Sequence, residues 1–346
     1  MRPVVNLKPM ALAAIAAMLA CRAAAAPAPA LPAYGADPQQ TSVSGLSSGA
    51  FMATQLQVAY SGSIVGAGIV AGGPYYCAAA GGFMFIRICM GRVPLEPPNA
   101  ALLVAAARGF TAEQIDPLSN LSRRRIYVFS GTYDTVVFPR AVDAAVSFFR
   151  QAGVTPAHLS YVNTMSAGHA LIAPDSGREC AANTDPYINR CLVGGQAYDQ
   201  AGELLKHIYG PLKPRVSQPT GSIISFNQSA YASAAARMAP TGYLYVPPSC
   251  SVAGARCKVH VALHGCLQST ESVGNKFYTD TGYNHWADAN NLLVLYPQVN
   301  KSDVLDHSLT NRDGCWDWWG YTGANYAWKK SPQMSAIMAM VNQLTR

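Results

Sequence analysis

Charge is scarce in this chain: Asp, Glu, Lys and Arg make up 12% of its residues, about half the usual share. Lys and Arg outnumber Asp and Glu by 25 to 18, but no basic run exceeds Arg123-Arg124-Arg125. Nucleic-acid-binding proteins normally carry clustered basic residues, so we expect no nucleic-acid partner. Half of the 346 residues are apolar, which is ample for a large core. The surface must then be mostly uncharged, as suits a protein that acts on an uncharged partner.

A long apolar run is missing everywhere except near the N-terminus. There Arg2 and Lys8 precede an apolar stretch at 10–20 and an Ala-rich stretch to 26. This order is typical of a secretory signal, and the apolar stretch is too short for a mature transmembrane helix. The sequence therefore predicts a signal peptide over 1–26 and a soluble, secreted protein without membrane insertion. Periplasmic retention and a lipid anchor on Cys21 are the alternatives; Leu19 fits a lipoprotein cleavage site poorly.

The C-x-x-C motif and paired histidines are also absent, which disfavours zinc, and we expect no metal or organic cofactor. Apart from Cys21, the chain has eight cysteines. An even number in an exported chain indicates disulfides. Proximity along the chain favours three pairs and leaves a fourth: Cys77–Cys89, Cys180–Cys191, Cys250–Cys257 and Cys266–Cys315. The count alone allows 105 pairings, so the connectivity stays open at this point.

Strand-like and helix-like segments alternate along the rest of the chain. Short apolar runs predict strands from residue 41 and at 64–71, 125–130, 157–163, 241–246, 258–263 and 292–296. Helical spacing predicts helices after residue 47 and at 100–108, 139–152, 201–209, 284–290 and 333–344. This alternation is typical of a mostly parallel sheet flanked by helices. With no repeat or linker, we expect one α/β domain over 41–346, behind an extended or disordered Pro/Ala-rich lead-in at 27–40.

The strongest motif is Gly45-Leu46-Ser47-Ser48-Gly49, between the first expected strand and the first helix. A serine between two glycines at such a junction is typical of the nucleophile elbow of serine hydrolases. The glycines let two backbones approach closely, and the tight turn exposes the serine hydroxyl above the sheet. The motif therefore predicts that Ser47 is a nucleophile. A plain Gly/Ser turn is the alternative, since five letters alone arise often in a glycine-rich chain.

A serine nucleophile needs an imidazole base and a carboxylate that orients the base. In α/β-hydrolases these follow in the order Ser, Asp, His, each after a strand. Asp134 follows the strand expected at 125–130, and His169 lies in a loop after the one at 157–163. The rival acids are Asp116, in a turn before a proline, and Asp143, within a helix. The other histidines fall in strands, helices or loops without this placement: His158, His207, His260, His285 and His307.

Two amides must also hold the oxyanion that forms during acyl transfer. One is expected from the residue after the nucleophile, Ser48. The other normally comes from a His-Gly loop that precedes the nucleophile, whereas here Leu263-His264-Gly265-Cys266 follows it. If this loop supplies the second amide, the fold is a circularly permuted α/β-hydrolase. The alternative is that His264-Gly265 only turns a strand.

Five segments together resemble the extracellular poly(3-hydroxybutyrate) depolymerases whose catalytic domain is circularly permuted: SGLSSGAFM, GTYDTVV, SAGHA, LHGCLQ and GCWDWWGY. The resemblance runs from about residue 41 to the last helix. It implies Ser47 as nucleophile, His169 as base, Asp134 as its orienter, and the amides of Ser48 and Cys266 as the oxyanion hole. Many family members add a linker and a polymer-binding domain, which this sequence does not show. We therefore expect its substrates to be soluble oligomers or amorphous polyester.

Trp316, Trp318 and Trp319 cluster beside Cys315. They form either a buried aromatic core or the apolar rim of a cleft that grips a polyester chain. From all these features we expect a secreted, monomeric serine esterase acting on poly(3-hydroxybutyrate) or its oligomers through a hydroxyacyl-enzyme. A general carboxylesterase of the feruloyl or acetyl type is the alternative. A non-catalytic protein that binds a polymer surface is a further one.

Overall fold

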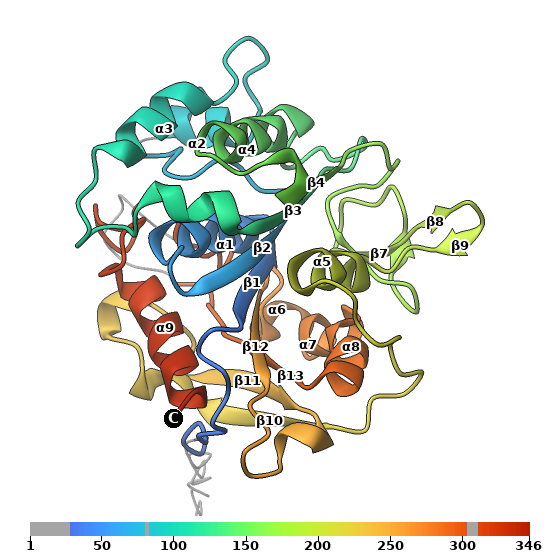
Figure 1. The fold of residues 1–346 in the computed structure, drawn as a ribbon. Helices are drawn as coiled ribbons and strands as arrows, with labels where there is room; N and C mark the ends of the chain where they lie inside the picture. Colours follow the sequence, from blue (N-terminus) through green and yellow to red (C-terminus); the bar gives the residue numbers. More distant parts are fainter. Residues whose placement is uncertain (1–27, 80–82, 303–310) are drawn as a thin grey trace, which may run out of the picture.

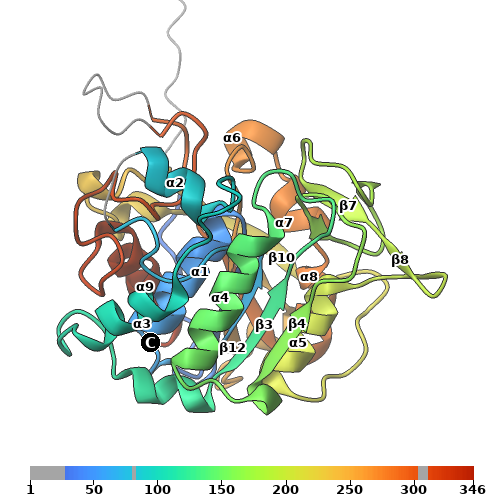
Figure 2. The same cartoon turned by 90° about the horizontal axis from the view of Figure 1, so that it is seen from above.

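The computed structural model describes residues 28–79, 83–302 and 311–346 (Figure 1). The expected signal peptide at 1–26 and His307 both fall outside the described residues. An eight-stranded sheet in the order β10-β11-β13-β12-β1-β2-β3-β4 forms the centre of the molecule. Figures 1 and 2 show this sheet running through the fold with helices on both sides. The expectation of an α/β fold with a mostly parallel sheet in a single domain is confirmed.

Six neighbouring strands of the sheet are parallel: β13, β12, β1, β2, β3 and β4. Strands β10 and β11 extend it by antiparallel pairing. The bounds are β1 Thr41–Leu46, β2 Ile64–Val70, β3 Arg125–Phe129, β4 Leu159–Val162, β10 Ser222–Asn227, β11 Thr241–Val246, β12 Lys258–Leu263 and β13 Leu292–Tyr296. Strands β2, β3 and β13 are mostly apolar because helices cover both of their faces. Strands β1 and β12 differ, since they bury Ser42, Ser44 and His260 between them.

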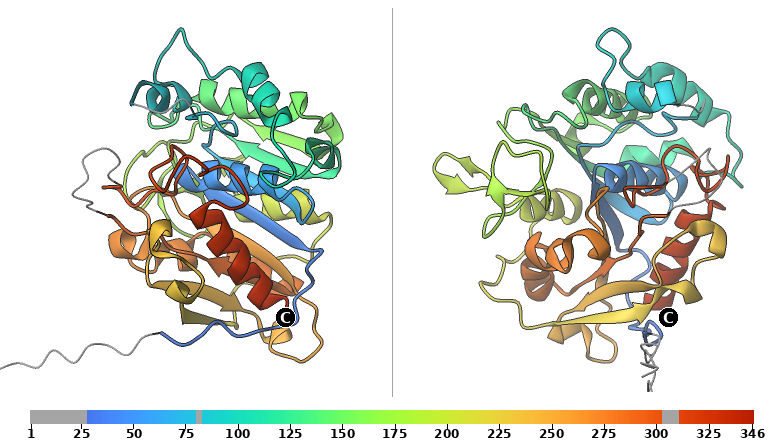
Figure 3. Two further views of the ribbon diagram at one scale, coloured as in Figure 1. Left: turned by 90° about the vertical axis from the view of Figure 1, so that its left-hand side faces the viewer. Right: turned by 180° about the vertical axis from the view of Figure 1, so that it is seen from behind.

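Helices α1 (Ser48–Ala59) and α9 (Pro332–Leu344) lie on one side of the sheet, and α5 (Gln200–Tyr209) and α8 (Tyr283–Asn290) on the other (Figure 1). Helices α2 (Phe83–Cys89), α3 (Ala100–Arg108) and α4 (Pro139–Gln151) gather near the β3–β4 edge. The shorter α6 (Thr270–Val273) and α7 (Lys276–Asp280) precede α8. Figure 3 shows α9 packed along the sheet close to the start of the described chain.

The sheet order explains why the His-Gly loop comes late in the sequence. Strand β12, which is encoded more than 200 residues after β1, pairs with β1 in parallel. Both strands therefore end at the same edge of the sheet, and the loop after β12 lies beside the turn after β1. This is the arrangement expected of a circularly permuted α/β-hydrolase.

Several segments differ from their expected structure. The edge strand β10 and the helix α2 fall where only loops were predicted. The lead-in is extended but not disordered from residue 28 onward: Tyr34 and Ala36 donate amides to the Leu344 carbonyl, and Leu31 is fully buried. Small two- and three-stranded pairings also form within 171–197: β5 Leu171–Ile172, β6 Arg178–Glu179, β7 Ile188–Arg190, β8 Leu192–Val193 and β9 Gln196–Ala197.

The four disulfides join the pairs that sequence proximity favours. Cys266–Cys315 closes the longest loop, 49 residues, and connects the His-Gly loop to the Trp-rich segment. In the part of the chain that the structure describes, we find no helix with the length and apolar character that crossing a membrane requires.

Candidate active site

Ser47 occupies a strained turn between β1 and α1. Its φ of 57° and ψ of −121° lie in a region that residues with a side chain seldom adopt. A Cβ on Gly45 would lie 2.3 Å from the Gly49 carbonyl carbon, and one on Gly49 would lie 2.3 Å from the Leu263 carbonyl oxygen. Only glycine fits at either position, so both glycines of the motif are required by close backbone approach. The geometry is that of the nucleophile elbow.

Asp134 and His169 meet as the order of strands predicts. Asp134 follows β3, His169 follows β4, and His169 Nδ1 lies 2.8 Å from Asp134 Oδ2. Each residue is only 3% exposed. The other carboxylate oxygen, Asp134 Oδ1, accepts the amides of Val136 and Val137. A carboxylate held in this way can fix the ring orientation of its partner and stabilise an imidazolium.

Asn183 holds the two loops together, and sequence reasoning missed it. Its Oδ1 accepts the amides of both His169 and Thr135 at 2.9 and 3.1 Å. Its Nδ2 donates to the Tyr133 carbonyl. Asn183 lies inside the loop closed by Cys180–Cys191, and that disulfide was the only sequence signal near it.

Ser47 and His169 are not joined by a hydrogen bond in this structure, since Ser47 Oγ has no hydrogen-bond partner among the described residues. Two contacts nevertheless connect their surroundings. Val137, three residues after Asp134, lines the same cavity as Ser47. The Tyr187 ring packs edge-on to His169, with centroids 6.0 Å apart, and its backbone is held by the loop that follows β12. In enzymes without substrate, such a serine–histidine hydrogen bond is often long or misaligned.

The loop after β12 lies directly against the elbow. A Cβ on Gly265 would be 3.4 Å from both Ser47 Cβ and the Leu46 carbonyl oxygen. The amides of Ser48 and Cys266 donate to no acceptor among the described residues, and both residues line one cavity with Ser47. The Ser48 amide also lies at the N-terminus of the 12-residue helix α1, whose dipole favours negative charge there.

This cavity has a volume of about 190 Å³ and a mostly apolar lining. Trp318 and Trp319 form part of its wall, and Trp318 stacks on Phe51 with ring centroids 4.3 Å apart. Trp316 behaves differently: it is fully buried and packs against His264, 5.4 Å between ring centroids. The expectation that Trp316 contacts substrate is therefore wrong in this structure, because its ring belongs to the core.

Asp317 organises the Trp-rich segment from inside. Its carboxylate accepts the amides of Trp319, Gly320, Tyr321 and Thr322 and the Thr322 hydroxyl. Burial raises the pKa of Asp317, and these hydrogen bonds act in the opposite direction. The segment that presents Trp318 and Trp319 is thus wound around one buried carboxyl group.

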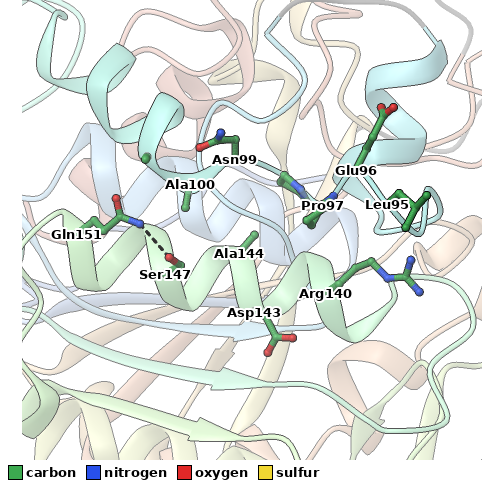
Figure 4. Close-up of a pocket in the computed structure, with 12 residues that line it drawn as sticks. Leu95, Glu96, Pro97, Asn99, Ala100, Arg140, Asp143, Ala144, Ser147 and Gln151 are labelled. Carbon is green, nitrogen blue, oxygen red and sulfur yellow. Dashed lines mark hydrogen bonds between the residues drawn. The ribbon is translucent and has the colours of Figure 1, made fainter.

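A larger hollow of about 760 Å³ lies between α3 and α4, away from Ser47 (Figure 4). Its wall includes Arg140, Asp143, Ser147 and Gln151, and Gln151 donates to Ser147 within it. Asp143, a rival of Asp134 for the carboxylate that orients the base, accepts a hydrogen bond from the Tyr161 hydroxyl instead. Asp116 accepts the Gly62 amide and pairs with Lys329. Neither rival acid contacts any of the histidines that the structure describes.

The remaining described histidines have structural partners. Backbone carbonyls are the partners of three of them: His158 contacts the Ser122 carbonyl, His207 the His158 carbonyl, and His285 the Val216 carbonyl. His260 and His264 are fully buried. Across 28–79, 83–302 and 311–346, no group of three or more His, Cys, Asp or Glu residues is placed to hold a metal ion.

Comparisons with known proteins place this chain among close relatives. The family described as Esterase PHB depolymerase matches residues 241–345. A polyhydroxybutyrate depolymerase from Talaromyces funiculosus is 41% identical, over 95% of this chain and 96% of that protein. A poly(3-hydroxybutyrate) depolymerase from Delftia acidovorans is 43% identical over 91% of this chain, which spans only 61% of that longer relative.

Two solved structures are similar over nearly their whole length. The PHB depolymerase from Penicillium funiculosum is 40% identical, with a TM-score of 0.82 over 91% of this chain and 98% of that one. A PHB depolymerase with a serine-to-alanine substitution, complexed with R3HB trimer, is 39% identical with the same TM-score and the same coverage.

Proposed function

This chain belongs to the poly(3-hydroxybutyrate) depolymerase family of ester hydrolases, and from this premise we propose that it cleaves ester bonds of poly(3-hydroxybutyrate) or its oligomers with Ser47 as nucleophile. His169 is the base, Asp134 orients it, and the amides of Ser48 and Cys266 hold the oxyanion. The predicted signal segment and the four disulfides support export. The protein acts as a secreted monomer on an aliphatic polyester.

The first half-reaction forms a hydroxyacyl-enzyme. His169 Nε2 takes the Ser47 proton as Oγ attacks the ester carbonyl, and Asp134 stabilises the resulting imidazolium. The carbonyl oxygen becomes an oxyanion that accepts hydrogen bonds from the two amides. As the tetrahedral intermediate collapses, the ester C–O bond breaks and His169 returns the proton to the leaving hydroxyl group. A shortened chain with a free hydroxyl end departs.

The second half-reaction releases the acid. His169 takes a proton from water, which attacks the acyl carbonyl and passes through the same oxyanion site. As the intermediate collapses, the bond to Ser47 Oγ breaks and His169 returns its proton to that oxygen. The hydroxy acid or short oligomer leaves and ionises to its carboxylate by losing a proton to solvent. Each step uses a side chain or an amide of this chain.

One observation carries the proposal: a strained serine shares a cavity with two amides that have no acceptor within the described part of the chain. One amide lies at a helix N-terminus and the other follows the end of a neighbouring strand. Two such donors beside a serine fit a tetrahedral oxyanion. The mostly apolar wall, with Phe51, Trp318 and Trp319, fits an uncharged aliphatic ester. The relative complexed with R3HB trimer supports a short oligomer as substrate.

The test compares Ser47→Ala with Ser119→Ala, a substitution at an exposed serine outside the site. The substrates are a suspension of amorphous poly(3-hydroxybutyrate), followed by turbidity, and soluble 3-hydroxybutyrate trimer, followed by acid release. We expect Ser47→Ala to lower kcat on both by about 10⁴-fold or more, with an unchanged circular dichroism spectrum. Ser119→Ala should match wild type.

Wild-type protein that hydrolyses acetyl or feruloyl esters but neither of these substrates would contradict the substrate assignment. Ser47→Ala protein with wild-type turnover would overturn the proposed nucleophile.

A further inference from the structure

The Cys266 amide, which we propose as the second oxyanion donor, belongs to the peptide between Gly265 and Cys266. Any contact that fixes the plane of this peptide therefore also fixes the direction of that amide. In a trans peptide the carbonyl and the N–H point in opposite directions from one rigid plane. A hydrogen bond to the Gly265 carbonyl therefore also sets the direction of the Cys266 N–H. This inference rests on the proposed role of the Cys266 amide.

The side chain of His264 makes such a hydrogen bond. The Val299 amide lies 3.0 Å from His264 Nε2 and can only donate to it, so Nε2 carries no proton. The neutral ring must then be protonated at Nδ1, which lies 2.7 Å from the Gly265 carbonyl oxygen and donates to it. Complete burial lowers the pKa of His264 to about 4, so the ring stays in this form near neutral pH.

We propose that His264 is a positioning residue, whose Nδ1–H fixes the rotation of the Gly265–Cys266 peptide so that the Cys266 N–H points into the cavity beside Ser47. The ring itself is fully buried and touches no substrate. It acts only through the peptide, and the Val299 amide selects the tautomer that makes this possible.

Gln268 secures the other side of Gly265. Its Oε1 accepts the Gly265 amide at 2.8 Å, and its Nε2 donates to the carbonyls of Pro186 and Tyr187. Both polar backbone groups of Gly265 are thus held by buried side chains, whereas Cys266 lines the cavity and its amide donates to no acceptor among the described residues. Because the Tyr187 ring packs against His169, Gln268 also connects the oxyanion loop to the loop of the proposed base.

The surroundings of His264 allow substitutions that separate hydrogen bonding from packing. The ring lies between Phe277 and Trp316, at 6.0 and 5.4 Å between centroids. Phenylalanine fills similar space without either hydrogen bond. Asparagine can place an amide nitrogen near the Nδ1 position, and glutamine can place its amide near the Nε2 position.

The experiment measures kcat and KM on soluble trimer for His264→Phe, His264→Gln and His264→Asn. We expect His264→Phe and His264→Gln to lower kcat by about 10- to 100-fold, less than the 10²–10³ for full loss of an oxyanion donor. KM should change by less than about threefold, because the uncharged ground-state ester depends little on the amide. His264→Asn, which keeps the donor to Gly265, should recover kcat to within about fivefold of wild type.

A second readout is inhibition by a phosphonate ester and by free 3-hydroxybutyrate. The phosphonate, once bonded to Ser47, presents an oxygen anion to the oxyanion hole, whereas the free acid does not mimic the intermediate. Inactivation by the phosphonate should slow in parallel with kcat across the three variants, and the inhibition constant of the acid should stay unchanged. If His264 had only a structural role, its substitution would change both the inactivation rate by the phosphonate and the inhibition constant of the acid, or neither of them.

Wild-type kcat in a folded His264→Phe variant would overturn the proposal, as would equal losses in His264→Asn and His264→Phe. If His264→Phe does not fold, His264→Gln carries the same expectation. The Ser47→Ala result separates the two levels: an inactive Ser47→Ala beside a fully active His264→Phe removes only the role of His264. Full activity in Ser47→Ala removes the proposed function and this inference with it.

Discussion

His169 and His260 are both buried imidazoles, but their hydrogen-bond partners differ in charge. His169 faces the Asp134 carboxylate at the carboxyl edge of the sheet. His260 lies in the middle of β12, where Ser42 and Ser44 of β1 meet its Nδ1 and Nε2 at 2.6 and 2.7 Å. The first pair can accommodate a proton that moves during a reaction. The second is built entirely from neutral groups.

The hydrogen bonds around His260 form a chain with one consistent direction. Tyr209 donates its hydroxyl to backbone carbonyls, so it accepts from Ser42. Ser42 then accepts from His260 Nδ1–H, and Nε2 accepts from Ser44. Ser44 in turn accepts from the Tyr283 hydroxyl. Every polar atom is satisfied only while the ring is neutral, and complete burial lowers the pKa of His260 to about 3.

The contrast shows how one fold uses the same side chain in two ways. Near the elbow, a carboxylate makes proton transfer possible. His260 lies three residues before the end of β12, roughly 10 Å along the strand at about 3.3 Å per residue. There, hydroxyl groups make protonation of the ring unfavourable, and their hydrogen bonds join β1 to β12. Because β1 and β12 are joined in this way, the residues that follow them, Ser47 and Cys266, are held next to each other at the edge of the sheet.

The largest effect is expected when the Asp134 carboxylate beside His169 is replaced by a neutral group, as the partners of His260 already are. Asp134→Asn keeps a side chain of the same size but favours the wrong imidazole tautomer and no longer stabilises the imidazolium. We expect kcat to fall by about 10⁴-fold, measured by acid release from trimer. The melting temperature should stay within a few degrees of wild type; a fall in kcat below tenfold would contradict the assigned role of Asp134.

A smaller effect is expected at Asp317, a buried carboxyl group that contacts no histidine. Asp317→Asn replaces one carboxylate oxygen with an NH₂ group that faces the Thr322 amide and hydroxyl, so the Trp318–Trp319 segment loosens. We expect KM for trimer to rise about tenfold and kcat to stay within about threefold. If kcat fell as far as in Asp134→Asn, carboxyl burial alone, not contact with an imidazole, would explain both results.

His260→Phe should affect stability and hardly affect turnover. The substitution leaves Ser42 and Ser44 without their shared partner in a buried site, which destabilises the fold by about 3 kcal/mol. Urea unfolding measures this loss, with the partly buried His158→Gln as a matched control. We expect kcat per folded molecule to remain within about twofold of wild type. A 100-fold fall in kcat without loss of stability would contradict a purely structural role.

The smallest effect is a change in the pH dependence of stability. The pKa of His260 is lowered on folding, from 6.5 to about 3. Between these values the unfolded chain binds one proton more than the folded chain. The stability that the neutral His260 ring contributes is therefore present above pH 6.5 and is lost as the pH falls. His264 acts in the same direction from 6.5 to about 4. His260→Phe should reduce the slope of unfolding free energy against pH, between pH 6 and 4.5, by about 1.4 kcal/mol per unit.

The sequence predicted those parts of the fold that depend on local pattern. Most strands and helices were predicted to within about two residues, because apolar runs and strand-end residues are local signals. The elbow was predictable for the same reason, since Gly45 and Gly49 are required by contacts of a single turn and its neighbour. Asp134 and His169 were predicted as partners because each lies in the loop that follows a strand, and the structure places their side chains 2.8 Å apart.

Features that depend on distant contacts could not be predicted. Strand β10 lies at the sheet edge and only Phe226 of its six residues is fully buried, so its sequence shows no buried run. Asn183 and Gln268 have ordinary loop sequences, and only the folded chain shows which carbonyls and amides they hold. Trp316 and Trp318 are two residues apart, but only Trp316 is buried against His264, which lies 52 residues earlier in the sequence.

The most direct test of this account is the site of covalent labelling by a fluorophosphonate. We predict one adduct per molecule, located by mass spectrometry on the peptide that contains Ser47, and almost none in Asp134→Asn or His169→Ala at the same reaction time. An adduct on another serine, or equal labelling of wild type and Ser47→Ala, would contradict it.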